Sequence, residues 1–252
     1  MINLILLWLP KVHSPTMRLM TQPSTDFFNQ ELAERYDERN QKLARISDSL
    51  HFLIKLVLES VPARARILCV GAGTGAEILS LATAFPGWSF VAVEPSLSML
   101  NVCRERIRSA GLLERCEFVH GFAQDLPARA DFDAVLAVLV AHFVRHDERL
   151  SFFKNLTDRL RVGGYLVNAE IGFDLDSVEF PSMLKNWESV QRLMGATPES
   201  LAALPQQLRS VLTVLSPLET EAILRESGID LPVRFFQAFM IAGWYGVKSA
   251  RA

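Results

Sequence analysis

The middle of the chain alternates between short apolar runs and amphipathic segments. Residues 67–70 form a continuous apolar run, which is typical of a strand buried on both faces of a parallel sheet. The spacing of apolar positions predicts further strands and helices along the chain. The expected strands cover residues 67–70, 88–94, 116–121, 132–140 and 165–172, and the expected helices cover residues 76–84, 95–111 and 149–164. Strands and helices that alternate at this spacing predict an α/β fold with a doubly wound, parallel sheet.

The C-terminal third departs from this alternation. Residues 173–215 contain helical turns interrupted by prolines and no strand of comparable strength. A helix over residues 218–227 then precedes two strands within residues 233–249, joined near Ala242 and Gly243, which predict an antiparallel hairpin. We expect residues 173–215 to form a helical lid insert over the carboxyl edge of the sheet, where open α/β sheets bind ligands.

The N-terminal part begins with an apolar run over residues 1–9. The run has about half the length that a membrane-spanning helix requires, and it lacks the basic start of a signal peptide. We expect residues 1–19 to be an extension or a misassigned start, with a docking strand or a weak signal or interfacial segment as alternatives. Apolar positions at helical spacing within residues 26–60 predict two helices. Residues 20–252 are therefore interpreted as one domain, with a helical cap over residues 20–62.

Composition and charge narrow the class of protein. The chain has 252 residues, of which 50% are hydrophobic and 21% charged, which fits one large globular domain and excludes disordered, collagen-like and disulfide-scaffold classes. The net charge of -2 creates no long-range field that would attract nucleic acid. Three scattered cysteines, Cys69, Cys103 and Cys116, suit a reducing compartment. We therefore expect a cytoplasmic protein with no nucleic-acid or membrane partner.

A glycine-rich turn carries the first candidate chemistry. Residues 71–75 read GAGTG between the first expected strand and its helix, where a chain without Cβ atoms exposes backbone N–H groups to a ligand. Glu94 ends the second expected strand about 20 residues further on, where its carboxylate can accept hydrogen bonds from both hydroxyls of a ribose. On the turn alone, a nicotinamide cofactor and other nucleoside cofactors both stay open.

Five segments together resemble the class I S-adenosylmethionine-dependent methyltransferases. Between residues 67 and 167 they read, in order, ILCVGAGTGAEILSLA, VAVEPSLSML, GFAQDLP, FDAVLAVLVAHF and LRVGGYLV. The resemblance implies a Rossmann-like fold with a mainly parallel seven-stranded sheet that ends in the antiparallel hairpin. It also implies S-adenosyl-L-methionine as the cofactor and S-adenosyl-L-homocysteine as its product.

The resemblance further implies which residues surround the cofactor. They are Tyr36, Gly71, Ala72, Gly73, Glu94, Pro95, Ser96, Met99, Phe122, Ala123, Val138 and Leu139. In this arrangement Glu94 holds the ribose hydroxyls, and the N–H of Ala123 faces the adenine edge. The glycine turn passes beside the methionine and ribose parts. Plain helix packing is the alternative for Tyr36 and Met99.

Two positions depart from the pattern that the family usually shows. Cys69 stands where an acidic residue often precedes the first glycine by two positions, so a contact to the ammonium group of the cofactor must come from elsewhere. Phe122 stands where the turn usually has Asp, so this ring could stack on adenine while Gln124 or Asp125 supplies an acceptor. These changes either weaken cofactor binding or adapt the site to an altered cofactor.

Methyl transfer from a sulfonium requires few catalytic side chains. Transfer from a sulfonium neutralises charge, so positioning supplies much of the acceleration and an acid/base pair is not obligatory. His142 follows the fourth expected strand and is the candidate general base for a hydroxyl or amine acceptor, with a structural role in its loop as the alternative. The histidines show no paired spacing with Cys or carboxylates that would close a zinc shell, so we expect no metal.

The expected lid carries a group of large apolar side chains. They line a pocket for a small-molecule methyl acceptor, hold the lid against the sheet, or form a homodimer surface. The residues are Phe173, Phe180, Met183, Leu184, Trp187 and Met194.

Three functions follow from these observations. The leading hypothesis is an S-adenosylmethionine-dependent methyltransferase that acts on a small organic acceptor. The second is a cofactor-modifying enzyme, because SPLETEAILRESGI, RFFQAFMIAGWYGVKS and the helical insert distantly resemble carboxy-S-adenosylmethionine synthase. That enzyme relies on an arginine in the insert, whereas Arg209 lies at a different offset from Glu219 and Thr220. The third is a non-catalytic S-adenosylmethionine-binding protein, which the changes at Cys69 and Phe122 keep open.

Overall fold

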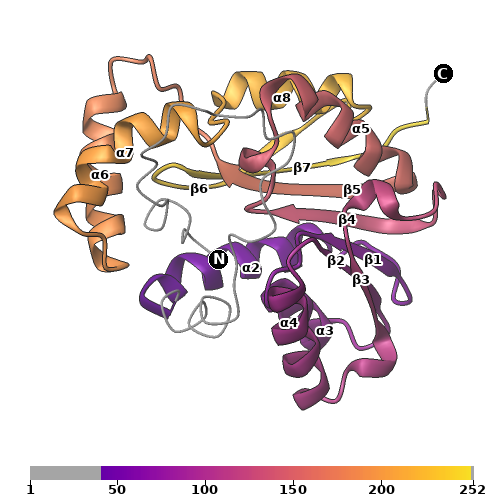
Figure 1. Ribbon diagram of the computed structural model, residues 1–252. Coiled ribbons are helices and arrows are strands. Elements are labelled where there is room, and N and C mark those ends of the chain that lie inside the picture. Colours follow the sequence, from indigo (N-terminus) through magenta and orange to yellow (C-terminus); the bar gives the residue numbers. More distant parts are fainter. Residues whose placement is uncertain (1–40, 251–252) are drawn as a thin grey trace.

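One twisted sheet with helices on both faces makes up the computed structural model, of which we describe residues 41–250 (Figure 1). Tyr36, the expected extension over residues 1–19 and the first part of the expected cap lie outside the described residues. The strands are β1 (Arg66–Val70), β2 (Ser89–Glu94), β3 (Cys116–His120), β4 (Phe132–Val138), β5 (Leu160–Ile171), β6 (Val233–Ala238) and β7 (Ile241–Val247).

The order of the strands confirms the predicted topology. The seven-stranded sheet runs β3-β2-β1-β4-β5-β7-β6. The first five strands in this order pair in parallel, whereas β7 is antiparallel to both β5 and β6. Parallel strands in such a sheet need crossover connections, and α-helices supply all of them except the one from β3 to β4, which is a loop with a single short 3-10 turn. The result is the expected Rossmann-like sheet with a C-terminal antiparallel hairpin.

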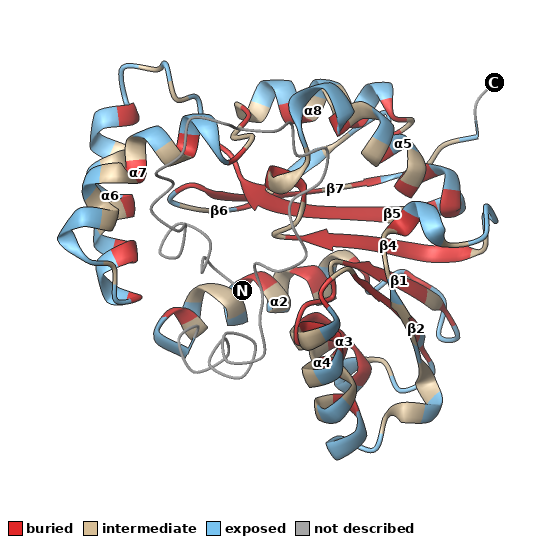
Figure 2. Ribbon diagram, viewed as in Figure 1, coloured by how far each residue is buried: buried red, intermediate tan, exposed pale blue. Residues whose placement is uncertain are grey.

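The helices cover the two faces of the sheet. On one face lie α2 (Ala44–Val57), α3 (Ala76–Ala84) and α4 (Leu97–Ser109), and on the other lie α5 (Arg149–Arg159) and α8 (Pro217–Glu226) (Figure 1). Because side chains alternate along a strand, Ile67 and Cys69 join the core on the first face, and Leu68 and Val70 join the core on the second. Figure 2 shows that the central strands are buried along most of their length. No helix within residues 41–250 is both long and apolar enough to cross a membrane.

One expected helix is shorter than its sequence suggests. The prediction of a helix over residues 149–164 is wrong at its end, because α5 stops at Arg159 and β5 begins at Leu160. Gly163 and Gly164 therefore lie inside a strand. Gly163 has a φ of +81°, and the register between β4 and β5 shifts near these glycines. The paired glycines thus mark an irregularity in the sheet, which local sequence does not distinguish from a helix end.

The turn of the hairpin also lies elsewhere than expected. The strands β6 and β7 are separated by Phe239 and Met240, and Phe239 has a φ of +51°. Ala242 and Gly243, where we expected the turn, pair with Glu170 and Ala169 of β5. The small residues serve close packing inside the sheet: a Cβ on Gly243 would meet the side chain of Phe235 at 3.1 Å.

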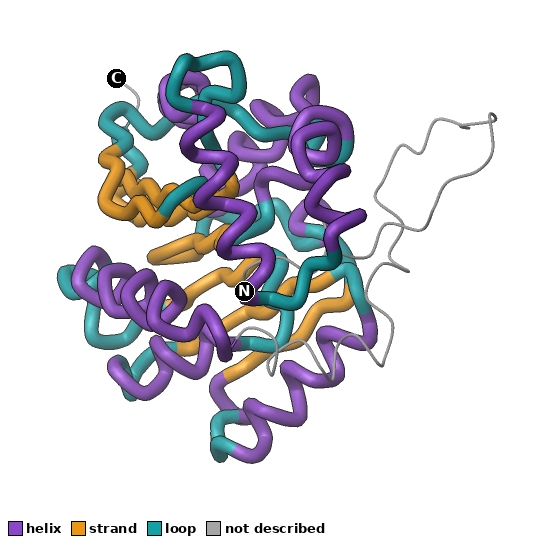
Figure 3. The backbone as a smooth tube through the Cα atoms, turned by 90° about the vertical axis from the view of Figure 1, so that its left-hand side faces the viewer, coloured by secondary structure: helices purple, strands orange, loops and turns teal. Residues whose placement is uncertain are grey.

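Two further helices lie beyond the carboxyl ends of β4 and β5. They are α6 (Phe180–Leu193) and α7 (Pro198–Ser210), and Figure 3 shows them from the edge of the sheet toward which these strands point. Trp187 and Leu208 are completely buried and belong to the same core as the sheet face that packs on α2. The large apolar side chains of residues 173–194 named above are all buried in this core or packed against it. The lid and the sheet therefore share one hydrophobic core.

A buried ion pair fixes the second face of the sheet. Arg149 of α5 donates to the carboxylate of Glu170 on β5, and both side chains are fully buried. Thr220 of α8 donates to the other oxygen of Glu170 at 2.8 Å, and Arg149 also donates to the carbonyl of Thr213 at 2.7 Å. This network joins two helices, a central strand and the segment that leaves α7.

Substitution of Arg149 by Met is expected to lower the free energy of unfolding by about 3–5 kcal/mol, because it leaves the Glu170 charge buried without its partner. Urea denaturation measures this loss. The matched control is Arg192→Met, which breaks the exposed pair of Arg192 with Glu188 within α6 and should change stability by less than about 1 kcal/mol. A similar small effect for both variants would contradict the stabilising role of the network.

Candidate functional site

The glycine turn leaves β1 at its carboxyl end and leads into α3. Gly71, Gly73 and Gly75 have φ angles of +61°, +54° and +81°, in the left-handed region that glycine adopts without steric cost. A Cβ on Gly71 would lie 2.4 Å from Cγ2 of Val140, so the turn passes directly against the loop that follows β4. The absence of a Cβ on Gly71 therefore lets the turn pack against this loop at the junction of β1 and β4.

Glu94 ends β2 beside this turn and is only 7% exposed. One carboxylate oxygen accepts the N–H of Gly73 at 2.9 Å, and the other accepts the N–H of Ser96 at 2.9 Å. Burial raises the pKa of Glu94, whereas these two hydrogen bonds act in the opposite direction. Each oxygen keeps further acceptor capacity, so the carboxylate can bind two neighbouring hydroxyls such as those of a ribose.

The next residues begin α4 at the same edge of the sheet. Ser96 is the N-cap of α4, and its side chain accepts the N–H of Met99 at 3.3 Å. Met99 is buried, and Pro95 is half-buried with its carbonyl 3.0 Å from Nε2 of His120. The structure thus brings Pro95, Ser96 and Met99 together with Glu94 at one edge of the sheet.

Phe122 and Ala123 lie at the end of the neighbouring strand β3. The N–H of Gly121 donates to the carbonyl of Glu94 at 3.1 Å, which ties this turn to β2. Ala123 is buried, and Phe122 is half-buried with its N–H donating to Oδ2 of Asp125 at 2.7 Å. The side chain of Asp125 therefore caps its own turn.

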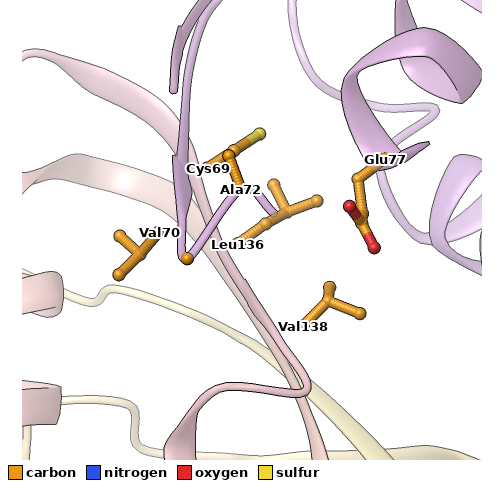
Figure 4. A pocket seen from close by; sticks show the side chains of 7 residues that line it. Cys69, Val70, Ala72, Glu77, Leu136 and Val138 are labelled. Atoms are coloured by element: carbon orange, nitrogen blue, oxygen red, sulfur yellow. The ribbon is translucent and has the colours of Figure 1, made fainter. Parts of the chain in front are cut away.

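The end of β4 closes the site on the other side of the glycine turn. Leu139 has a φ of +59°, which is rare for a residue with a side chain, and its N–H donates to the carbonyl of Ala169 at 2.6 Å. Val138 is buried and borders a small hollow beside the glycine turn (Figure 4). The hollow is lined by Cys69, Val70, Gly71, Ala72, Glu77, Leu136 and Val138. Glu77 is a new member of the site: the sequence showed an acid shortly after the glycine turn, but not the direction of its side chain.

His142 lies deeper than a surface loop would suggest. Its ring is 3% exposed, and its Nδ1 accepts the N–H of Ile171 at 3.3 Å. Burial, and secondly the charge of Arg149, lowers the pKa of His142 from 6.5 to about 3. The neutral ring therefore keeps its proton on Nε2, while Nδ1 accepts the hydrogen bond from the last residue of β5. The role of His142 as a general base stays a prediction.

Comparisons with known proteins identify the family. A methyltransferase domain family matches residues 67–164. Demethylmenaquinone methyltransferase of Clavibacter sepedonicus is 32% identical over 191 residues, which cover 70% of this chain and 74% of that protein. The chain therefore belongs to the S-adenosylmethionine-dependent methyltransferase family, and its cofactor is S-adenosyl-L-methionine. This result decides between the two classes of cofactor that the glycine turn alone left open.

More distant relatives agree on the fold. Carboxy-S-adenosyl-L-methionine synthase of Campylobacter hominis is 20% identical over 205 residues, which cover 81% of this chain and 86% of that protein. The crystal structure of an O-methyltransferase homologue from Nostoc punctiforme superposes with a TM-score of 0.64 at 16% identity. The match covers 87% of this chain, which spans 59% of the length of that structure.

Substitution of Glu94 by Gln is expected to weaken the binding of S-adenosylhomocysteine by about 1–3 kcal/mol, because the amide keeps the shape but loses one acceptor and the charge. Titration calorimetry measures the affinity. Glu105→Gln, an exposed substitution on α4, is the control and should leave it unchanged. Unchanged affinity in the Glu94 variant would remove this residue from the site.

The lowered pKa of His142 predicts a pH dependence of stability. The unfolded chain takes up a proton near pH 6.5, but the folded chain does not do so until about pH 3, so stability is lost as the pH falls through this interval. Between pH 7 and pH 5, the wild type should lose about 2 kcal/mol more stability than His142→Asn, whose side-chain oxygen can still accept the Ile171 N–H. Urea denaturation at both pH values measures the difference, and equal losses would contradict it.

Proposed function

We propose that the protein transfers the methyl group of S-adenosylmethionine to a small organic acceptor that binds between the carboxyl edge of the sheet and helices α6 and α7. The observation that carries this proposal is the Glu94 carboxylate, which is held by the glycine turn and the start of α4 in one buried arrangement. Each oxygen of this carboxylate keeps further acceptor capacity, which fits the two hydroxyls of a ribose.

Different residues of the chain bind different parts of the cofactor. Glu94 accepts the ribose hydroxyls, and Ala123 presents its N–H to the adenine edge. Gly71 allows close approach of the methionine part, and Val138 and Leu139 border that part on the side of β4. The sulfonium supplies an electrophilic methyl group, so the chain needs mainly to orient this group toward the acceptor and to exclude water.

Polar atoms of the lid support an acceptor that carries polar groups. Trp187 and Gln191 lie four residues apart on α6 and are both buried. Within the described chain, the indole N–H of Trp187 and both amide atoms of Gln191 have no hydrogen-bond partner. Because a buried polar group without a partner is unfavourable, a hydroxyl, carbonyl or amine of an acceptor would gain free energy by pairing with them.

A second candidate function is modification of the cofactor itself. The match to carboxy-S-adenosyl-L-methionine synthase over 81% of the chain favours it. Against it stands the environment of Arg209, which donates to Oδ1 of Asp176 at 2.8 Å and packs over the ring of Phe180. These contacts use the guanidinium to hold α7 to the start of α6 and the loop before it, so methyl transfer is the better supported function.

An assay with isotope-labelled cofactor tests the proposal. The purified protein is incubated with methyl-labelled S-adenosylmethionine and a panel of phenols, hydroquinones including a demethylmenaquinol analogue, and amines. We expect S-adenosylhomocysteine and a labelled product, both identified by mass spectrometry, with one class of acceptor. Gln191→Leu should raise the KM for that acceptor several-fold while Arg192→Met, on the exposed face of α6, does not.

Two other outcomes would overturn the leading function. A carboxylated nucleoside released from the purified protein would favour the second candidate. Binding of S-adenosylhomocysteine without turnover of any acceptor would indicate a non-catalytic binding protein.

A further inference from the structure

Glu77 is a buried acid that no role described so far uses. It lies in the first turn of α3, two residues after Gly75, and is 4% exposed. Figure 4 shows its carboxylate on the helix side of the hollow, turned toward Val138 and facing the strand side, where Cys69 lies. The helix therefore places a negative charge directly at the junction of β1 and β4.

Within residues 41–250, one imidazole lies close to this charge. Nε2 of His51, on α2, lies 3.4 Å from Oε1 of Glu77. Among the described residues, no Lys or Arg forms an ion pair with Glu77. A carboxylate in the first turn of a helix gains from the helix dipole, which explains an acid at this position but not its direction into a hollow. A buried charge with one imidazole partner still favours a cationic ligand.

The order of the strands indicates which part of the cofactor would lie at this hollow. Along the carboxyl edge the order is β3, β2, β1 and β4. With adenine beside Ala123 after β3 and the ribose at Glu94 on β2, the atoms beyond the ribose extend toward β1 and β4. That end of S-adenosylmethionine is an amino acid, which carries an ammonium group.

The lining of the hollow leaves one side chain to meet this ammonium. Apart from Glu77, the lining is apolar or backbone, except for the thiol of Cys69. Burial, and secondly the charge of Glu77, raises the pKa of Cys69, so this thiol stays neutral. Glu77 is therefore the carboxylate that lines the hollow.

We infer that Glu77 binds the ammonium group of the methionine part of the cofactor, and that His51 orients the Glu77 carboxylate for this contact. The inference rests on the placement of the cofactor in the proposed function. Cys69 stands on the strand where the family often has an acid, and the inference assigns this contact to an acid on the helix at the opposite side of the same hollow.

Comparing two ligands on one variant tests the inference. S-adenosylhomocysteine carries the amino acid, whereas 5′-methylthioadenosine shares its adenosine part but has no amino acid. Titration calorimetry with Glu77→Gln should show S-adenosylhomocysteine binding about 10- to 100-fold more weakly, the range of a hydrogen bond to a charged group. The affinity for 5′-methylthioadenosine should stay within about twofold of the wild type.

Three further variants sharpen the result. Glu94→Gln should weaken both ligands, because both carry the ribose. His51→Gln should weaken S-adenosylhomocysteine selectively but less than Glu77→Gln does. The double variant Cys69→Asp with Glu77→Gln returns a carboxylate to the other side of the hollow, and it should recover part of the lost affinity.

Several outcomes would overturn the inference. Unchanged binding of S-adenosylhomocysteine to Glu77→Gln would do so, and so would an equal loss for both ligands. If Glu77→Gln does not fold, the wild type is titrated with a deaminated analogue of S-adenosylhomocysteine, and equal affinity for the two compounds overturns the inference. A Glu94→Gln variant that binds both ligands normally would instead show that the proposed placement of the cofactor is wrong.

Discussion

The carboxylate of Glu94 accepts hydrogen bonds from two backbone N–H groups that belong to different loops, and the rest of the site is arranged around it. Gly73 donates from the turn after β1, and Ser96 donates from the start of α4. Because both donors are backbone groups, the orientation of the carboxylate does not depend on another mobile side chain. The N–H of Gly121 adds the turn after β3 to the same strand end. Three loops that could move independently are thus fixed relative to one another.

The other face of the sheet contributes a second fixed point. Glu170 holds Arg149 and Thr220, and Arg149 reaches the carbonyl of Thr213, just beyond α7. The N–H of Thr213 in turn donates to the carbonyl of His142 at 2.9 Å. The loop after β4 and the return of the chain from the lid are therefore linked through a buried polar network. A lid that shares its core with the sheet and is fixed at its end can define the volume left for an acceptor.

Most of the fold was predictable because parallel strands and their helices leave strong local patterns. The strand over residues 67–70 is apolar at every position, and the structure extends it by Arg66 alone. The predictions failed where glycine carried the signal. Gly163 and Gly164 indicated a helix end, and Gly243 indicated a turn, but each lies within a strand. A glycine marks a place where a side chain does not fit or a φ is unusual, and only the paired strand shows which of these applies.

The sequence by itself determined the class of fold, the position of the glycine turn and the identity of Glu94 as the acid at the end of β2, because each follows from neighbouring residues along the chain. Only the tertiary structure decided the surroundings of Glu77 and His142. Glu77 meets His51, which is 26 residues away in the sequence, and His142 accepts a hydrogen bond from Ile171, which is 29 residues away. Burial, charge balance and protonation depend on such distant contacts, which the packing of helices on the sheet creates and which no local pattern records.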